Sequence, residues 1–277
     1  MTRTAFPVRY RLVGLLTTGS MINYLDRVNI AVAAPVMMES LGWDEARFGV
    51  VFSAFLVGYA LLQFPGGVLA DRWNTHRLLI VVCIGFSVFT ALTPMGQLGF
   101  GLMLAIRFGV GMFESITFPA YAALNARWIP RQEYSRAQTL SISGAYLGQA
   151  VAYPLTTWLL AMFSWPVVFY CNAVLGGVWL IAWMAFATHT PAEHPKISQE
   201  ELKYIESNVA PRKKQNFSPW AVARERQVLL LSLSYLLLIY GLWMIVLWLP
   251  TYMVKVRGFT LQQMGWVGII PTFASFV

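Results

Sequence analysis

The sequence predicts an all-α fold, that of a polytopic membrane protein, from three observations. Hydrophobic residues make up 57% of the 277 residues and charged residues only 12%, with a mean hydropathy of +0.58. Soluble domains carry about 25% charged residues. Apolar segments long enough to cross the roughly 30 Å hydrocarbon core recur along the chain, and basic residues gather in alternate loops between them. Together these features indicate helices that cross a bilayer rather than a large soluble core.

We expect seven complete membrane-spanning helices and the start of an eighth. The complete spans lie near 12–37, 48–70, 78–95, 98–124, 138–163, 167–187 and 228–253. The eighth begins near Leu261, and as a helix it would reach only about 25 Å by Val277. We therefore expect the sequence to stop inside a helix. The predicted organisation is an N-terminal six-helix bundle (1–187), a cytoplasmic linker (188–227) and an incomplete C-terminal bundle (228–277).

The distribution of positive charge predicts the orientation of the helices. If the N-terminus is cytoplasmic, fifteen of the twenty Lys and Arg residues lie in inside segments and three in outside loops, with Arg27 and Arg107 inside spans. The positive-inside rule therefore places the N-terminus in the cytoplasm. Because the basic residues flank helices instead of forming one patch, we expect no nucleic-acid partner despite the net charge of +8. Asp26 interrupts the first apolar run, which argues against a cleavable signal sequence.

The cysteines and histidines do not predict a disulfide framework, a metal site or a cofactor site. Cys83 and Cys171 both lie in apolar spans, where small packing residues are the simpler interpretation. The three histidines are scattered, and no Cys/His spacing suits zinc. No His/Asp/Ser constellation gathers at one membrane depth, so we do not expect an enzyme.

The polar stretch from Thr188 to Gln227 predicts a linker that contains a short helix. Ser198 and Glu201 form a capping-box pattern. An apolar stripe at helical spacing follows, made of Leu202, Ile205 and Val209. The basic run at 212–214 is suited to anionic headgroups. We interpret this stretch as a helix resting on the cytoplasmic surface, with a regulatory site as the alternative.

Four charged residues lie inside the predicted spans, namely Asp26, Arg27, Arg107 and Glu114. Each costs roughly 2.5–3.5 kcal/mol at the bilayer centre, so they must pair with one another or line a wet cavity. Static ion pairs are one interpretation, but buried pairs often only break even in stability, which favours a solute pathway. Arg27 can bind a carboxylate through two parallel hydrogen bonds. Asp26 and Glu114 can each take up a proton on one side of the membrane and release it on the other. We expect Arg107 to be the cation that neutralises the two carboxylates.

Other span residues predict packing or leave their role open. Gly144 and Gly148 in the fifth span are typical of close helix packing, while the orientation of Gln149 between bundle and cavity is open. In the seventh span, Tyr240 and Trp243 are candidates to face a cavity.

The loop between the second and third spans reads GVLADRWNTHR from Gly67 to Arg77. It resembles the signature loop of the major facilitator superfamily, Gly-x-x-x-Asp-Arg-x-Gly-x-Arg-Arg, with Asn74 and His76 as departures. A plain charged loop is the alternative. We expect Gly67 to permit close helix approach, and the turn to survive at Asn74 because asparagine tolerates the left-handed conformation. The resemblance implies a gating motif made of Gly67, Asp71, Arg72 and Arg77, in which Asp71 and the basic residues form a breakable charge network at the cytoplasmic gate.

Further motifs resemble one branch of that superfamily, the anion:cation symporter family of sugar-acid, aromatic-acid and sialin-type carriers. They are Asn23-Tyr24-Leu25-Asp26-Arg27, Glu114 with Pro119, and Trp128-Ile129-Pro130 with Arg136. Arg107 with Gly111 matches the Arg-x-x-x-Gly pattern of the superfamily as a whole. The resemblance implies a substrate-binding set of Tyr24, Arg27 and Tyr59. It implies a proton-coupling set of Asp26, Glu114 and Arg107. It also implies a six-helix bundle built from two inverted three-helix repeats.

The function that we expect is secondary active transport by proton-coupled symport of a small organic anion. The anion would be a sugar acid or an aromatic or other carboxylic acid, and the only coupling partner would be the proton, without a cofactor or metal. We expect a monomer in the inner (cytoplasmic) membrane of a bacterial-type cell. A non-transporting membrane sensor or assembly subunit on the same scaffold, and an exporter of the same superfamily, are the alternatives.

Overall fold

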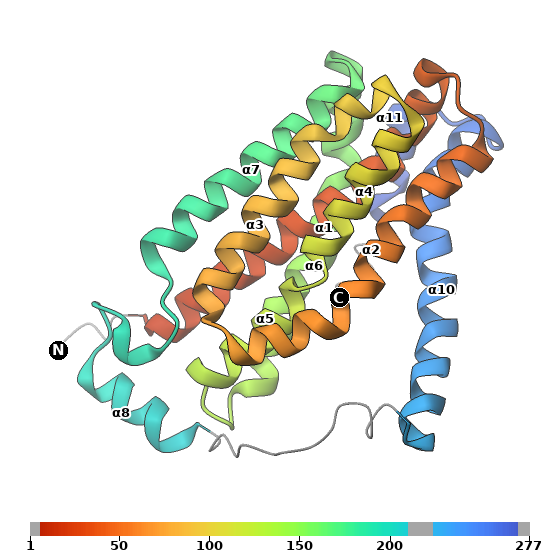
Figure 1. The fold of residues 1–277 in the computed structure, drawn as a ribbon. Coiled ribbons are helices and arrows are strands. Elements are labelled where there is room, and N and C mark those ends of the chain that lie inside the picture. Colours follow the sequence, from red (N-terminus) through yellow and green to blue (C-terminus); the bar gives the residue numbers. More distant parts are fainter. Residues whose placement is uncertain (1–5, 210–223, 271–277) are drawn as a thin grey trace.

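The computed structural model describes residues 6–209 and 224–270, which form helices lying side by side in one elongated bundle (Figure 1). The predicted all-α class is confirmed. The α-helices are α1 (Val8–Leu41), α2 (Glu45–Arg72), α3 (Thr75–Leu92), α4 (Phe100–Glu114), α5 (Thr117–Trp128), α6 (Tyr134–Met162), α7 (Trp165–Phe186), α8 (Gln199–Asn208), α10 (Arg226–Lys255) and α11 (Leu261–Val267). Two 3₁₀ helices, Thr93–Leu98 and Pro191–Glu193, connect them.

Five helical segments in the described part of the chain are long and apolar enough to cross a membrane. They are Glu45–Arg72, Thr75–Leu98, Phe100–Trp128, Trp165–Phe186 and Arg226–Lys255. The other two predicted spans, α1 and α6, are equally long at 34 and 29 residues but more polar. They pack against each other along the bundle, and the polar residues in the middle of α1 are buried between helices. The predicted eighth span begins at α11, and its end lies outside the described residues.

The fourth predicted span is broken into α4 and α5. Pro119 removes one hydrogen bond close to the break, because it has no N–H to donate to the carbonyl of Ser115. Prolines inside α1, α2, α6 and α10 do not interrupt those helices, so Pro119 alone does not account for the break. α4 ends at Glu114, and α5 starts at Thr117. Glu114 therefore occupies the last position of a helix rather than the middle of one.

Glycines let two pairs of helices approach within backbone contact. A Cβ on Gly111 of α4 would overlap the backbone carbonyl of Phe55 on α2. A Cβ on Gly144 or Gly148 of α6 would overlap the backbone of α1 at Thr17 or Met21. The packing role predicted for Gly144 and Gly148 is confirmed.

The helix pairs repeat within the bundle. α1 packs on α6 and α7, while α4 packs on α2 and α3, and α3 also packs on α7. If α1, α2 and α3 are exchanged with α4, α6 and α7 respectively, the same pairs of helices are in contact. It is the pattern that two three-helix repeats would produce.

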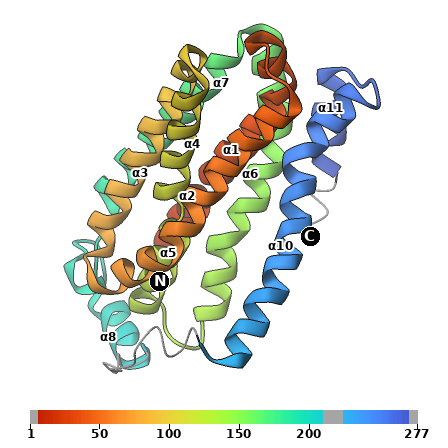
Figure 2. The same ribbon diagram turned by 45° about the vertical axis from the view of Figure 1, so that its right-hand side comes forward.

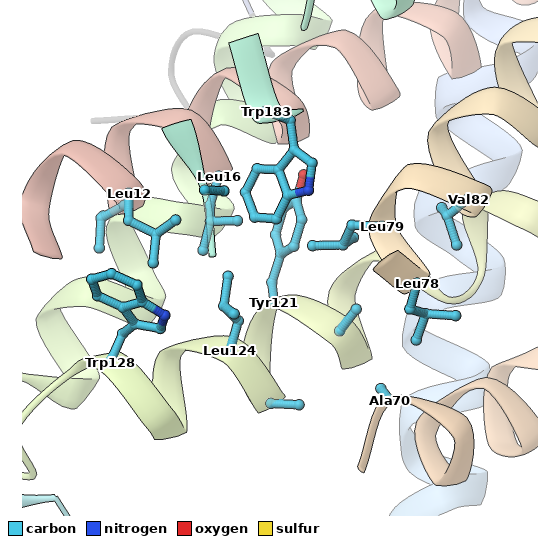
Figure 3. Close-up of a cluster of buried hydrophobic side chains, with 14 of the residues drawn as sticks. Leu12, Leu16, Ala70, Leu78, Leu79, Val82, Tyr121, Leu124, Trp128 and Trp183 are labelled. Carbon is cyan, nitrogen blue, oxygen red and sulfur yellow. The ribbon is translucent and has the colours of Figure 1, made fainter. Parts of the chain in front are cut away.

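An apolar core closes the end of the bundle near the N-terminus. Figure 3 shows Trp128 of α5 and Trp183 of α7 with leucines of α1 and α3 around them. Both tryptophans are fully buried. Cys83 is buried beside this cluster, and Cys83 and Cys171 are both free thiols, as the sequence predicts.

α10 runs along the outside of the bundle, and α11 folds back beside α6 (Figure 2). α10 contacts α1, and its most apolar stretch has no buried residue. Trp243 and Leu247 of α10 nevertheless pack on the bundle. The division into two bundles stays a prediction.

The predicted linker helix lies across the end of the bundle that holds the N-terminus (Figure 1). Ser198 caps α8 by accepting from the backbone N–H of Glu201, but the capping box is not closed. The carboxylate of Glu201 instead accepts from the backbone N–H groups of Val8 and Arg9, at 3.0 and 3.2 Å. It also binds the Arg9 guanidinium at 3.0 Å. A negative charge at the N-terminus of α1 is favourable because the helix dipole is positive there.

A second carboxylate strengthens this attachment. Glu133, in the loop before α6, binds Arg9 at 2.9 Å and accepts from the hydroxyls of Tyr10 and Tyr204. Although burial opposes it, these hydrogen bonds hold the pKa of Glu133 below its usual value. Ile205 is buried beneath α8, as the apolar stripe predicts. The basic run at 212–214 lies outside the described residues.

Candidate functional site

The centre of the candidate site is a buried ion pair between α1 and the end of α4. Arg27 Nε lies 2.6 Å from Glu114 Oε2, and the two side chains are 3% and 0% exposed. The sequence predicts both residues for this site but assigns the neutralising role to Arg107. That assignment is wrong for Glu114, because its ion-pair partner is Arg27. Glu114 is the last residue of α4, so the ion pair joins α1 to the end of that helix.

Five aromatic rings surround the Arg27 guanidinium. Its central carbon lies 4.5 Å from the ring centroid of Tyr59 and 4.8 Å from that of Tyr24. The rings of Phe55, Trp243 and Phe118 follow at 5.6, 5.8 and 5.9 Å. Such contacts favour a cation that has been removed from water.

The five rings around Arg27, from Tyr24, Phe55, Tyr59, Phe118 and Trp243, form an aromatic cage. The cage brings together residues that the sequence predicts and residues that it misses. Tyr24 and Tyr59 are adjacent to Arg27, as predicted. Trp243 also faces the site from α10, whereas Tyr240 is 67% exposed and its place at a cavity stays a prediction. Phe55 and Phe118 were not predicted. Phe55 has a positional signal, because it lies four residues, one helical turn, before Tyr59 on α2. Phe118 has none, because the helix is broken between it and Glu114.

Arg107 is buried close to the ion pair without sharing it. Its side chain is 2% exposed, and within the described residues its Nε and Nη1 have no hydrogen-bond partner. The ring of Phe55 lies 5.1 Å from its guanidinium carbon and 5.6 Å from that of Arg27. One aromatic ring therefore contacts both arginines.

Asp26 binds neutral groups on two other helices. Its Oδ2 accepts from Thr90 Oγ1 of α3 at 2.9 Å, and its Oδ1 accepts from Asn172 Nδ2 of α7 at 3.1 Å. The Asp26 side chain is 1% exposed. The sequence misses Thr90 and Asn172, because neither residue carries a local signal that distinguishes it from other polar residues in apolar helices.

Donors and acceptors left open at the site define what it can bind. Besides the two atoms of Arg107, Arg27 Nη2 and Glu114 Oε1 have no hydrogen-bond partner within residues 6–209 and 224–270. Buried charged groups are costly unless they are hydrogen-bonded. Two guanidinium groups with open N–H donors suit an anion, and the open carboxylate oxygen suits a proton. Across the same residues, no group of three or more His, Cys, Asp or Glu side chains could hold a metal ion.

Comparison with known proteins agrees with the fold. Residues 16–277 match the sequence profile of the Major Facilitator Superfamily. The chain belongs to this superfamily. Its fold is also that of a solved transporter, a bacterial homolog of the human lysosomal transporter Spinster in an inward-facing, unoccupied conformation. The TM-score is 0.75 at 16% identity, over 98% of this chain and 62% of that one.

The relatives of this superfamily member are transporters of anions. It is 33% identical over 268 residues to the sodium-dependent phosphate transport protein 1, chloroplastic, of Arabidopsis thaliana, covering 96% of this chain and 52% of the relative. It is 32% identical to the probable sulfoacetate transporter SauU of Cupriavidus necator, covering 97% and 63%. It is 29% identical to the probable galactarate/D-glucarate transporter GudP of Bacillus subtilis, covering 97% and 62%. The chain spans about half the length of the chloroplast relatives.

The superfamily loop between α2 and α3 differs from two of the expectations. A Cβ on Gly67 would have open space around it, whereas one on the preceding Gly66 would overlap Ile116, which lies just before α5, so Gly66 makes the close approach. Asn74 is not left-handed, having φ −65° and ψ 107°, and its side chain caps α3 by accepting from the Arg77 backbone N–H. Glycine is therefore not required at position 74.

The same loop is fastened to two neighbouring helices. Arg127 at the end of α5 donates to Thr75 Oγ1, and the Thr75 backbone N–H donates to His189 Nδ1 at 3.1 Å. Trp183 of α7 donates to the carbonyl of His76 at 3.2 Å. The predicted charge network of Asp71, Arg72 and Arg77 stays a prediction, and all three residues are exposed at this end of the bundle.

Proposed function

We propose that the protein is a proton-coupled symporter of a small organic anion. One observation carries the proposal. Arg27 is paired with Glu114 inside an aromatic cage, while Arg107 beside them keeps open N–H donors. A site that only stabilised the bundle would pair its arginines fully. Two partly open guanidinium groups that share one aromatic ring suit a small anion instead.

The substrate would bind between the two arginines. Arg27 Nη2 and Arg107 Nε and Nη1 can donate to its carboxylate, and guanidinium groups favour such planar, two-bond contacts. The tyrosines of the cage, Tyr24 and Tyr59, would supply walls and hydroxyl groups. The relatives are named for phosphate, ascorbate, sulfoacetate and galactarate or D-glucarate, which are all anions.

Coupling would follow from competition for Arg27. While Glu114 is ionised it occupies Arg27 Nε, so an entering anion meets a guanidinium that is already paired. A proton on Glu114 weakens that pair and frees the arginine for the substrate carboxylate. One proton and one negative charge then move together, which avoids adding an uncompensated charge to a buried site. Asp26 would be the second proton-carrying group.

The same proposal includes the cellular setting. We place the protein in the inner membrane as a multi-pass monomer with its N-terminus in the cytoplasm. The excess of basic residues in segments on one side supports this orientation, and two relatives are bacterial.

The test is uptake by the intact protein reconstituted in proteoliposomes. The probes are ascorbate, sulfoacetate, D-glucarate and inorganic phosphate, each with a pH gradient, a sodium gradient or no gradient. We expect a pH gradient to drive accumulation of an organic anion, and Glu114→Gln to abolish that accumulation while counterflow of the anion continues. Glu39→Gln is the matched control, because Glu39 is an exposed carboxylate near the C-terminal end of α1.

Four results would contradict the proposal. Unchanged accumulation by Glu114→Gln under a pH gradient would remove Glu114 from coupling. Accumulation driven by sodium alone would replace the proton as the coupling ion. Binding of an anion without counterflow would indicate a sensor, and net movement only out of the cytoplasmic side would indicate an exporter.

A further inference from the structure

The strongest feature that the proposed function leaves unused is the hydrogen bonding of Asp26. Asp26 and Arg27 are neighbours in the chain, yet their side chains have different partners. Arg27 binds Glu114, whereas Asp26 binds Thr90 and Asn172. Each carboxylate oxygen of Asp26 accepts one hydrogen bond from a neutral donor.

The chemistry of these donors favours the ionised form of Asp26. The Asn172 amide N–H can only donate, so it loses its acceptor if that oxygen of Asp26 becomes protonated. The Thr90 hydroxyl can donate or accept, so it can turn to receive the proton of a protonated Asp26. The pair of donors is therefore suited to a carboxyl group that changes its protonation state in place.

Charged groups reach Asp26 from other elements. The charges of Asp26 and Arg107 attract each other, those of Asp26 and Glu114 repel, and Arg27 follows Asp26 on α1. From α3 and α7, the groups that bind Asp26 are the uncharged Thr90 and Asn172. The hydrogen bonds from Thr90 and Asn172 thus stabilise the Asp26 carboxylate and leave both arginines available to the substrate.

We propose that Thr90 and Asn172 are positioning residues that hold Asp26 as a second proton-binding group, separate from the Arg27–Glu114 pair. Protonation of Asp26 forms one O–H bond on its carboxyl group, and release returns that proton to water. A proton on Oδ2 reverses the Thr90 bond, while Oδ1 still accepts from Asn172, so protonation alters the contact of α1 with α3 and keeps the contact with α7. This inference rests on the proposed function for its role in coupling, but not for the hydrogen bonds themselves.

Infrared spectroscopy of the purified intact protein tests the inference without a substrate. The protonated-carboxyl band that is absent from Asp26→Asn reports Asp26, and its midpoint is measured as a function of pH. Because a hydrogen bond to a charged group is lost, we expect Thr90→Val to move the midpoint upward by about one pH unit. Asn172→Leu should move it in the same direction, and Thr90→Ser should leave it unchanged.

The outcomes separate this inference from the proposed function. An unmoved midpoint in both Thr90→Val and Asn172→Leu would overturn the inference, whatever the transport assays show. A moved midpoint in a protein whose uptake ignores the pH gradient would support the positioning role and contradict only the proposed function. Two variants on different helices are used so that a folding defect in one leaves the other to decide.

A separate observation indicates a buried water site. Asn23 of α1 is 1% exposed, and both polar atoms of its side chain lack a hydrogen-bond partner within the described residues. Thr117 of α5 is 3% exposed, and its hydroxyl likewise has no partner among them. Both residues line one cavity, whose other walls include Leu79, Val82 and Tyr121 of the core in Figure 3.

The size and chemistry of this cavity fit one water molecule. The space open to the centre of a water molecule is about 10 Å³, near the minimum that a single water needs. The Asn23 amide supplies a donor and an acceptor, and the Thr117 hydroxyl supplies either. A cation would meet an amide N–H and no carboxylate. We infer that Asn23 and Thr117 bind a buried water molecule between α1 and α5.

Thermal unfolding of the intact protein tests this site, because a dry cavity and a bound water predict opposite changes in the melting temperature of Thr117→Val. In a dry cavity, Thr117→Val would remove an unpaired buried hydroxyl at constant shape and raise the melting temperature. With a bound water, the same substitution removes one of its partners and lowers the melting temperature. We expect Thr117→Val to lower the melting temperature and Thr117→Ser to preserve it. A rise in Thr117→Val, or a crystal structure with no density between Asn23 and Thr117 at a resolution that shows ordered water, would overturn the inference.

Discussion

Arg27 and Glu114 form a 2.6 Å ion pair although 87 positions separate them in the chain. The pair joins α1 to the point where the fourth span is broken, and no part of it is more than 3% exposed. Because the pair is buried, water cannot replace a hydrogen bond that is lost when one of the two side chains changes its geometry. Small alterations of the arginine should therefore have large effects.

Arg27→Lys should impair transport although it keeps the positive charge. Lysine is a point charge and cannot keep one contact with Glu114 while offering a second, parallel N–H to the substrate. We expect the rate of anion counterflow to fall by about 10- to 100-fold, the equivalent of one hydrogen bond to a charged group. Arg47→Lys on α2, an exposed arginine, is the control. A rate within twofold of the unmodified protein for Arg27→Lys would contradict the assigned role.

Gly111→Ala should destabilise the packing of α2 on α4. The added methyl group would overlap the carbonyl oxygen of Phe55, and backbone cannot move aside as a flexible side chain can. Overpacking of this kind costs about 1–3 kcal/mol. The melting temperature should fall accordingly. Gly101→Ala, in the same helix with open space around its Cβ, should be neutral or slightly stabilising. Equal effects of the two substitutions would contradict the close approach.

Asn74→Ala should cost more stability than Asn74→Gly, although glycine is common at this position of the superfamily loop. The Asn74 side chain caps α3, and replacing such a cap by alanine typically costs about 1 kcal/mol. Glycine usually costs only a few tenths, because it exposes the same N–H groups to water. Chemical or thermal unfolding measures the difference. A clear gain of stability in Asn74→Gly would indicate a left-handed residue and contradict the observed φ of −65°.

Docking of α8 should weaken in acid. The pKa of Glu133 is held below its ordinary value of 4.5 by hydrogen bonds that act against burial. A lowered carboxyl pKa contributes stability that is fully present above the ordinary value and is lost as the pH falls through the lowered one. Hydrogen-exchange protection of the α8 amides, corrected for intrinsic rates, should therefore fall below about pH 4.

Two variants check the source of that acid sensitivity. Glu133→Gln should reduce α8 protection at neutral pH, because the amide cannot replace the ion pair with Arg9. Glu206→Gln, an exposed acid on α8 itself, should leave protection unchanged. Protection that stays constant down to acid pH would exclude Glu133 as the attachment.

The parts of the structure that the sequence predicts are those encoded by local pattern. Span positions follow from runs of apolar residues, and the burial of Asp26, Arg27 and Glu114 follows from the cost of exposing charge to lipid. The close packing at Gly144 follows from residue size. Each of these depends on one helix and its solvent, which a linear sequence describes well.

The errors arise where the outcome depends on several helices at once. Arg27 and Arg107 are chemically alike, and only the packed bundle decides which of them meets Glu114. Thr90 and Asn172 become partners of Asp26 because α3 and α7 bring them there. Asn74 was assigned a conformation from its residue type, but its capping bond to α3 favours an extended backbone.

The continuous helix α1 connects the two groups of charges described above. Arg9, near its first turn, is held by Glu133 and by Glu201 of the linker helix, while Arg27 lies eighteen residues further along the same rod, about 27 Å away. A displacement of α8 would therefore move α1 as a rigid helix. The displacement would reach the guanidinium of Arg27, in the middle of α1, without passing through any loop.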